Sequence, residues 1–299
     1  MSVEVLCIGH ACWDLCFVVD AFPVENSKME TELLLESGGG PAANAAWLLA
    51  RWGVPTALAA LVGEDEYGRR TVTELRRGGI DCRVVELRPG HATPVSAIIS
   101  NRLNGSRTIC NRKLPSAVLV LNRSEITALQ PRLLLFDGHE LDASLEAMKV
   151  FPKAITVLDA GSLREGTETL SRQVDYLVCS ERFASQVTGK RDVISDWRGC
   201  LKQLRAINGK VAAVTLGAQG VAFDDGEEQG HLPALPVKAV DTTAAGDIFH
   251  GAFAYALVKQ MKLREALQMA IVAAGLSVGK MGGRLSVPEL ETVQKTLRQ

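Results

Sequence analysis

The sequence is poor in aromatic residues, has almost no net charge and contains no long apolar run. Aromatic side chains make up 5% of its 299 residues, and 33 basic residues balance 34 acidic ones, for a formal net charge of -1. A chain without excess positive charge has no long-range attraction for polyanions, so we expect no nucleic-acid and no membrane partner. No segment reaches the roughly 18 consecutive apolar residues of a membrane span. Small-molecule chemistry is therefore the default expectation.

The seven cysteines lack metal-binding spacing. No Cys-x-x-Cys pair occurs, and an odd number of cysteines without a histidine in zinc spacing indicates free thiols in a reducing compartment. Residues 1–15 have no basic segment and carry acids within their apolar part, unlike a signal peptide. We therefore expect a cytoplasmic protein.

Apolar runs alternate with helical patterns along most of the chain, which is typical of a parallel α/β sheet. The predicted buried strands cover 3–9, 56–63, 132–138, 154–161, 174–180 and 210–223. The predicted helices cover 40–53, 68–80, 142–150, 165–173, 181–188 and 194–207. Most strand runs end in Gly, Asp or Ser, and ligands gather at the carboxyl ends of parallel strands. We expect one α/β domain over 1–299, built around a mostly parallel sheet.

Two segments interrupt this alternation. The first contains two alternating runs around Pro23, and the second contains two β-rich runs around Asn104-Gly105, a strong hairpin signal. These segments, about 13–37 and 93–113, are expected to form a small β-sheet lid outside the main layer. Because exposed strand edges favour pairing with a second copy, we also expect a homodimer through the lid.

Residues 241–247 read Asp-Thr-Thr-Ala-Ala-Gly-Asp and precede a predicted helix. Small residues at a helix start leave backbone amides unshielded, and these amides can hold a developing negative charge together with the helix dipole. Beside them, Asp247 would accept a proton from an attacking hydroxyl. The alternative is a plain helix cap, because acids are common in the first helical turn.

A second glycine-rich segment precedes the helix at 40–53. Three consecutive glycines allow the backbone to approach a ligand closely, and Asn44 would face the cleft from the first turns. The segment is neither a Walker A loop nor a G-x-G-x-x-G fingerprint. Residues 38–68 and 241–253 together closely resemble the two signatures of the ribokinase, or PfkB, family of carbohydrate kinases, and the strand-helix order matches that family along nearly the whole chain.

This resemblance implies a ribokinase-like three-layer sandwich with a β-sheet lid, and phosphorylation of a sugar or nucleoside hydroxyl by ATP with magnesium. Asp247 would be the base, and the amides of Ala244, Ala245 and Gly246 would form the anion hole for the transferred group. The residues that match the sugar side are Asp14, Gly39, Gly40 and Asn44, with a turn carboxylate as the alternative role for Asp14. Those that match the nucleotide side are Ser180, Thr215, Gly217, Gly220 and Gly282. Asp241 and Thr243 match positions that offer oxygen ligands to a monovalent cation such as potassium.

Two departures from the family pattern concern the metal and the substrate. Ser180 and Phe183 replace the Asn and Glu of the family's N-x-x-E motif, so magnesium would be held mainly by ATP oxygens and water. Pro41 stands where ribokinases proper have a lysine, which makes ribose itself less expected.

Polar residues expected on the lid and at one strand end bear on the acceptor. Lys28 and Asn111 match in spacing two residues that sulfofructose kinases use for their sulfonated sugar, but His139 stands where those enzymes have an arginine. With Arg107 and Arg112, these residues would suit an anionic or strongly polar group if they face the cleft, and solvated surface is the alternative.

We therefore expect an ATP-dependent sugar kinase that transfers the γ-phosphoryl group to a hydroxyl, preferably primary, of a ketose, a pentose or an anionic sugar derivative. A nucleoside kinase is one alternative, although few aromatics are present to bind a base. A non-catalytic sensor of sugar or nucleotide is the other, because the N-x-x-E motif is lost.

Overall fold

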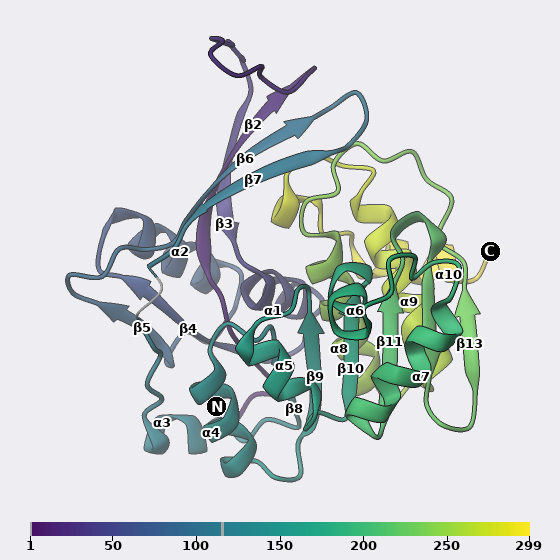
Figure 1. Ribbon diagram of the computed structural model, residues 1–299. Coiled ribbons are helices and arrows are strands. Elements are labelled where there is room, and N and C mark those ends of the chain that lie inside the picture. Colours follow the sequence, from purple (N-terminus) through teal and green to yellow (C-terminus); the bar gives the residue numbers. More distant parts are fainter. Residues whose placement is uncertain (1, 115–116) are drawn as a thin grey trace.

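The large central sheet organises the structure. A computed structural model describes residues 2–114 and 117–299, in which nine strands follow the order β13-β12-β11-β10-β9-β8-β1-β4-β5 (Figure 1). Their bounds are β1 (Val5–Ile8), β4 (Thr56–Gly63), β5 (Val85–Arg88), β8 (Leu133–Phe136), β9 (Ile155–Ala160), β10 (Tyr176–Ser180), β11 (Val211–Thr215), β12 (Val221–Asp224) and β13 (Gln229–Leu232). Neighbouring strands are parallel except for two pairs, β11 with β12 and β12 with β13. The predicted mostly parallel sheet is confirmed.

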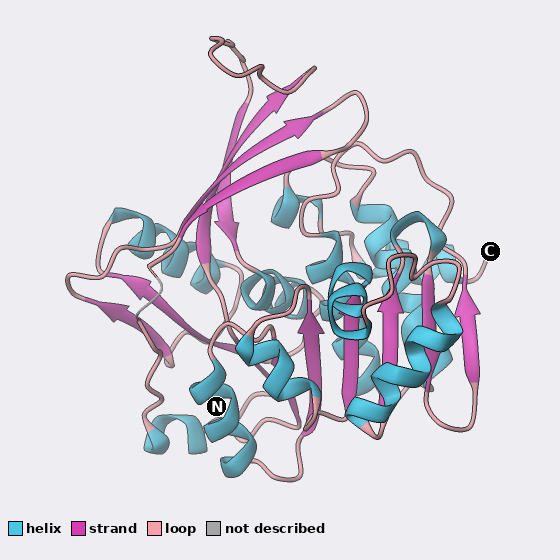
Figure 2. Cartoon of the chain, viewed as in Figure 1, coloured by secondary structure: helices cyan, strands magenta, loops and turns pink. Residues whose placement is uncertain are grey.

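Helices cover both faces of this sheet (Figure 2). One face packs against α1 (Pro41–Arg51), α2 (Glu66–Arg77), α8 (Ala245–Val258), α9 (Leu263–Ser277) and α10 (Leu290–Leu297). The other packs against α3 (Arg123–Thr127), α4 (Leu141–Val150), α5 (Glu165–Ser171), α6 (Glu181–Thr188) and α7 (Trp197–Asn208). Because helices bury both faces, the inner strands are mostly apolar, and β4 is buried along its whole length.

A second sheet of four strands, for which we keep the name lid, stands apart from the central one (Figure 2). In the order β3-β2-β6-β7 its strands are β3 (Leu34–Gly39), β2 (Cys12–Val19), β6 (Val95–Asn101) and β7 (Arg107–Arg112). The two antiparallel pairs, β2 with β3 and β6 with β7, were expected. The parallel pairing of β2 with β6 joins them into one sheet, and local sequence patterns do not indicate it.

The lid hairpin contacts the segment that precedes α8. Gly105 has φ +70°, and a Cβ there would lie 3.2 Å from the backbone of Ala239. The carbonyl oxygen of Gly105 accepts hydrogen bonds from the amide of Thr242 (3.3 Å) and from its hydroxyl (3.0 Å). Arg107 Nη1 donates to the same hydroxyl at 2.6 Å. The turn of the lid is therefore attached to residues 241–247.

Some expectations need correction. The predicted strand over 210–223 is two antiparallel strands, β11 and β12, joined through the 3-10 turn η1 (Gly217–Gln219). Gly220 has φ +89°, and a Cβ there would lie 2.0 Å from the carbonyl oxygen of Leu232, so this turn requires glycine. The short elements β5, β13 and α3 were not predicted. In the described part of the chain, no helix is both long and apolar enough to cross a membrane.

Candidate active site

Asp247 does not cap the helix on which it lies. Helix α8 begins after Ala244, whose φ of 61° is left-handed, and no side chain caps its start. The Asp247 carboxylate instead accepts a hydrogen bond from Asn44 Nδ2, with 2.7 Å between Nδ2 and Oδ2. A Cβ on Gly246 would meet no atom within 4 Å, so this turn faces open space. The two predicted motifs therefore meet at one carboxylate.

Of the three amides predicted to form the anion hole, one has a partner within the chain. The amide of Ala245 donates to the carbonyl oxygen of Thr242 at 3.3 Å. Among the described residues, the amides of Ala244 and Gly246 donate to no acceptor. Two amides at the start of α8 thus remain available to an anion, beside the positive end of the helix dipole.

Asn44 is held in place by an arginine that sequence analysis did not select. Arg284 lies in the 3-10 turn η2 (Gly283–Ser286), is 1% exposed and donates from Nε to Asn44 Oδ1 at 3.0 Å. It also donates to the carbonyl oxygen of Gly39 at 3.3 Å, and its Nη1 lies 3.4 Å from Glu74 Oε1. The only available signal was its place in the Gly-Gly-Arg stretch at 282–284, which suggested a loop beside the nucleotide.

Burial and a hydrogen bond act in opposite directions on Asp247. Removal of the carboxyl group from water raises its pKa, and the hydrogen bond from Asn44 lowers it. His250, one turn further along α8, also lowers the pKa, whereas the carboxylate of Asp14 raises it. The net result is an Asp247 pKa above the ordinary value, which moves the group toward the working range of a general base.

His250 and Asp159 form a buried pair behind the base. His250 Nδ1 lies 2.7 Å from the carbonyl oxygen of Gly246 and 3.2 Å from Asp159 Oδ2, and Nε2 lies 3.1 Å from the carbonyl oxygen of Val178. Each ring nitrogen therefore faces a backbone carbonyl oxygen, and Nδ1 also faces the Asp159 carboxyl group. Burial raises the pKa of Asp159 to about 7, with His250 opposing the shift. The pair joins the start of α8 to β9 and β10.

On the predicted sugar side, glycines allow the chain to pass close to polar groups. A Cβ on Gly39 would lie 2.0 Å from Asp14 Oδ2, and one on Gly40, with φ +97°, would lie 2.3 Å from the carbonyl oxygen of His10. Asp14 is half-buried on β2 and accepts a hydrogen bond from Cys12 Sγ at 3.2 Å. Burial raises the Asp14 pKa. The predicted glycines are thus required by geometry.

Three of the five residues predicted to contact a charged part of the acceptor, Lys28, Asn111 and His139, do not lie together. The Lys28 side chain is 86% exposed and pairs with Glu30, in the loop between β2 and β3. Asn111 is exposed on β7, directly opposite Ser96 of β6. His139 is half-buried and stacks on His10, with 4.7 Å between ring centroids. No recorded contact of Lys28 involves Asn111 or His139.

The predicted nucleotide residues lie at the carboxyl ends of adjacent strands. Ser180 and Thr215 are paired in register at the ends of β10 and β11. The Ser180 hydroxyl caps α6 by accepting from the amide of Phe183 (3.1 Å), and it donates to the carbonyl oxygen of Gly161. Gly217, with φ +55°, opens η1, and a Cβ there would meet no atom within 4 Å. This edge is open enough for a ligand to approach the backbone.

The predicted monovalent-cation residues are buried beside η2. Both carboxylate oxygens of Asp241 accept backbone hydrogen bonds, from the amides of Thr243 and Gly282, each at 2.9 Å. The hydroxyl oxygen of Thr243 is buried without a hydrogen-bond partner within the described chain. Among the described residues, no group of three or more His, Cys, Asp or Glu side chains could hold a metal ion.

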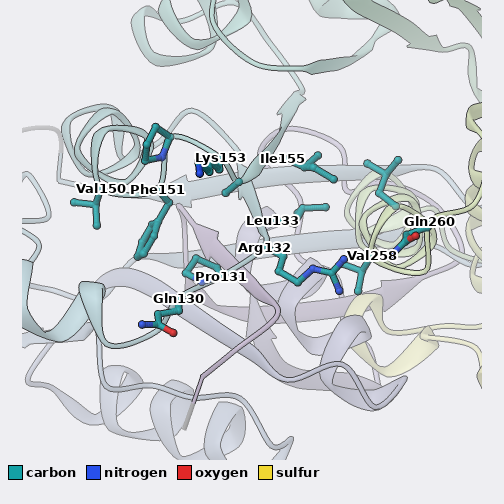
Figure 3. A pocket seen from close by; sticks show the side chains of 13 residues that line it. Gln130, Pro131, Arg132, Leu133, Val150, Phe151, Lys153, Ile155, Val258 and Gln260 are labelled. Atoms are coloured by element: carbon teal, nitrogen blue, oxygen red, sulfur yellow. The ribbon is translucent and has the colours of Figure 1, made fainter.

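A cavity of about 520 Å³ lies elsewhere, at the opposite ends of β8 and β9 (Figure 3). Its lining includes Arg132, Phe151, Lys153, Ile155 and Gln260, and none of the residues predicted to bind sugar or nucleotide. The candidate site is therefore an open edge of the sheet under the lid and not this cavity.

Comparisons with known proteins agree with this arrangement. The model of the pfkB family carbohydrate kinase matches residues 3–290. Fructokinase-1 of Oryza sativa subsp. japonica is 30% identical over 305 residues, which cover 91% of each chain. Ribokinase of Lactococcus lactis is 27% identical over 306 residues, covering 99% of this chain and 97% of the relative.

Solved structures share the fold. A ribokinase-like protein from Agrobacterium tumefaciens superposes with a TM-score of 0.90 at 30% identity, covering 100% of this chain and 98% of the other. A match to the family along almost the whole chain, together with the meeting of Asn44 and Asp247, shows that this protein belongs to the PfkB family of carbohydrate kinases.

Proposed function

We propose that this carbohydrate kinase transfers the γ-phosphoryl group of ATP to a hydroxyl group of a sugar, with Asp247 as the general base. The observation that carries the proposal is the 2.7 Å hydrogen bond between Asn44 and Asp247, residues 203 positions apart. This hydrogen bond holds the carboxylate beside the start of α8, where no side chain caps the helix. Two backbone amides at this helix start donate to no acceptor among the described residues. A group that accepts a proton then lies next to groups that stabilise a transferred anion.

In the proposed reaction, the acceptor hydroxyl oxygen forms a bond to the γ-phosphorus of ATP. The bond from this phosphorus to the bridging oxygen breaks, ADP leaves with the electron pair, and the hydroxyl proton passes to Asp247. The available amides of Ala244 and Gly246 would face the transferred group, whereas the amide of Ala245 donates to Thr242. Asp14 accepts hydrogen bonds from other sugar hydroxyls, and the lid keeps out water, the competing acceptor.

ATP is proposed to lie over Ser180, Thr215, Gly217 and Gly220, with Gly282 nearby. A ribokinase of similar fold from Arabidopsis thaliana was solved with ribose and ATP, which supports ATP as donor. Bound magnesium would neutralise phosphate charge. Since the chain presents Ser180 and Phe183 in place of Asn and Glu, the nucleotide and water would supply most of its ligands. The unpartnered hydroxyl of Thr243, beside Asp241, is compatible with a potassium ion.

The acceptor is proposed to be a ketose, a pentose or an anionic derivative of one. Relatives named fructokinase, ribokinase and deoxyribokinase support the ketose and the pentose. A nucleoside acceptor and pure ligand sensing are alternatives that the same assay distinguishes. Turnover with nucleosides alone would exclude the sugar proposal, and sugar binding without ADP release would favour a sensor.

Asp247→Asn tests the proposal. Loss of the base is expected to reduce kcat by a factor of about 10² to 10⁴, because this is the usual contribution of general base catalysis. ADP release is measured with fructose, ribose, deoxyribose and nucleosides as acceptors. Glu291→Gln, which neutralises an exposed acid in the first turn of α10, is the matched control and should retain full activity. An undiminished rate in Asp247→Asn would eliminate Asp247 as the base.

A further inference from the structure

Two basic side chains that the sequence did not predict, Lys113 and Arg164, converge on His139, which was predicted to contact a charged part of the acceptor. Lys113 follows β7 at the base of the lid, His139 follows β8, and Arg164 directly precedes α5. Lys113 Nζ lies 3.1 Å from His139 Nδ1, and Arg164 Nη1 lies 2.9 Å from the same nitrogen. All three residues are half-buried. We call Lys113, His139 and Arg164 the basic cluster.

The charge of the basic cluster is incompletely balanced within the protein. A neutral imidazole has one acceptor nitrogen, so His139 cannot compensate two cations. Of the two cationic groups, only Lys113 has a carboxylate oxygen within 4 Å among the described residues, Oε1 of Glu140 at 3.9 Å from its Nζ. Arg164 makes no ion pair with any described residue, and its Nη2 donates to the neutral hydroxyl of Ser162 at 2.9 Å. Half-buried cations with so little compensation are favourable for an anion.

The pKa values of His139 and His10 are lowered in the presence of this positive charge. Burial first, and then Arg164 and Lys113, lower the pKa of His139 to about 2. The pKa of His10, which stacks on His139, is also held well below its usual value, chiefly by burial and then by His139. Both rings are therefore neutral at physiological pH, and the positive charge belongs to the lysine and the arginine.

The basic cluster adjoins the candidate active site. Asp137, at the end of β8, accepts hydrogen bonds from the amide of His139 (2.9 Å) and from the amide of Ala42 (3.1 Å) in the first turn of α1. This is the helix that carries Asn44. The charges of Asp247 and Arg164 both act on the Asp159 carboxyl group: Asp247 raises the pKa of Asp159, and Arg164 lowers it. The cluster and the base therefore lie at the same edge of the sheet.

Two of the three residues of the basic cluster lie on the side of the site away from the proposed nucleotide. Its residues follow β8, β9 and the lid strand β7, whereas Ser180 and Thr215 end β10 and β11. In the order β11-β10-β9-β8-β1, Arg164 follows the strand next to β10, whereas His139 and Lys113 lie further from the nucleotide edge, after β8 and the lid strand β7. An anion held by His139 and Lys113 would accordingly belong to the acceptor and not to the triphosphate.

We propose that Lys113, His139 and Arg164 bind an anionic group of the acceptor sugar, namely a carboxylate, a sulfonate or a phosphate ester. The planar guanidinium of Arg164 offers paired donors to two oxygens, Lys113 adds a charge, and His139 offers a ring nitrogen. The proposal rests on the proposed sugar kinase function and specifies its acceptor. It replaces Lys28 as the residue that recognises charge on the sugar.

Calorimetric titration with matched acceptors tests the proposal. Glucose is compared with gluconate, and fructose with fructose 6-phosphate, in the presence of magnesium and a nonhydrolysable ATP analogue. The anionic member of at least one pair should bind at least tenfold more tightly. Arg164→Gln and Lys113→Gln should each weaken that binding by a factor of about 10 to 100, as expected for the loss of a charged hydrogen bond, while the neutral member is unaffected.

Two substitutions of the same kind serve as controls. Arg123→Gln and Lys149→Gln remove exposed charges on α3 and α4 and should leave binding unchanged. Arg164→Lys keeps the charge but loses the paired donors, so an intermediate affinity would confirm a direct contact even if Arg164→Gln folds poorly. Equal affinity for the neutral and anionic member of both pairs would overturn the proposal.

Turnover separates this proposal from the one on which it rests. Phosphorylation of neutral sugars alone would leave the sugar kinase function intact and refute the anionic acceptor. Absence of phosphorylation with every sugar would contradict the kinase function, and the calorimetric comparison would still decide whether the basic cluster binds an anion.

Discussion

Asn44 has its orientation fixed by chemistry. Arg284 has only donors, so the atom of Asn44 that faces it must be the amide oxygen, and the amide nitrogen then points to Asp247. A donor at this place stabilises the charged form of Asp247 against the effect of burial. One buried arginine thus orients the amide that stabilises the charged form of a carboxylate that the arginine does not contact.

This arrangement predicts a pH effect of Asn44→Ala. Asp247 is active as a carboxylate, so turnover falls as the pH drops through its pKa, which lies above the ordinary aspartate value. Without the Asn44 hydrogen bond, the pKa rises further, and the acidic limb of the kcat profile should move up by about one to two pH units. Asn122→Ala, a cap of α3, should leave the profile unchanged. An unshifted limb in Asn44→Ala would contradict the assigned role.

Arg284→Met is expected to lower stability. The substitution leaves Asn44 Oδ1 without its donor and removes the positive charge that pairs with Glu74. We expect the free energy of unfolding to fall by about 1–3 kcal/mol. Denaturant unfolding measures this change. In the Glu74→Gln variant, Arg284→Met should lower the free energy of unfolding by less, because no Glu74 carboxylate remains that the substitution would leave unpaired. Equal costs in the two backgrounds would show that the two residues are not coupled.

At the scale of elements, the sequence predicted those features that depend on neighbouring residues in the chain. Strand ends and helix starts were predictable because glycine, small residues and apolar runs mark them, which is how Asp247 and Gly39 were found. The sequence did not predict the roles of Arg284, Lys113 and Arg164, because their contacts are with residues on other elements of the fold. The contact of Arg284 with Asn44 spans 240 residues. The lid strands were recognised, but their parallel pairing was not, since register between distant strands depends on the assembled fold.

The attachment of the β6–β7 hairpin predicts a catalytic effect of Arg107→Ala. Loss of the bond to Thr242 should favour lid opening, raise the KM for the sugar by about twofold to tenfold and increase ATP hydrolysis relative to sugar phosphorylation. Arg102→Ala is the control, because Arg102 pairs with Asp20 inside the lid and does not reach residues 241–247. ADP and sugar phosphate are quantified separately. An unchanged ratio of the two products would argue against this contact as a closing element.

At the scale of the whole molecule, the lid presents an apolar outer face. Phe17 and Leu34 are directly opposite each other on β2 and β3, and they are 37% and 46% exposed. They point away from Cys16 and Val18, which are buried in the small core of the lid. Alternation along a strand puts successive side chains on opposite faces, so this outer face is available to a second copy.

The predicted homodimer can be tested on this face. Phe17→Glu should convert the dimer into a monomer, because it places a charge in the proposed interface. Light scattering coupled to size exclusion measures the mass of each form. Ile194→Glu changes an exposed apolar residue outside the lid and should have no effect. A wild-type chain that is monomeric at high concentration would refute the prediction.

The junction between lid and helix has one more consequence. Strand β3 ends at Gly39 and α1 begins at Pro41, so a single residue links the lid to the helix that carries Asn44. A rotation of the lid would therefore shift the start of α1 and would strain the hydrogen bond from Asn44 to Asp247. In the open conformation, when water can enter, this hydrogen bond would be weakest and Asp247 least restrained. Protection of ATP from hydrolysis would then be a mechanical property of how the chain is connected.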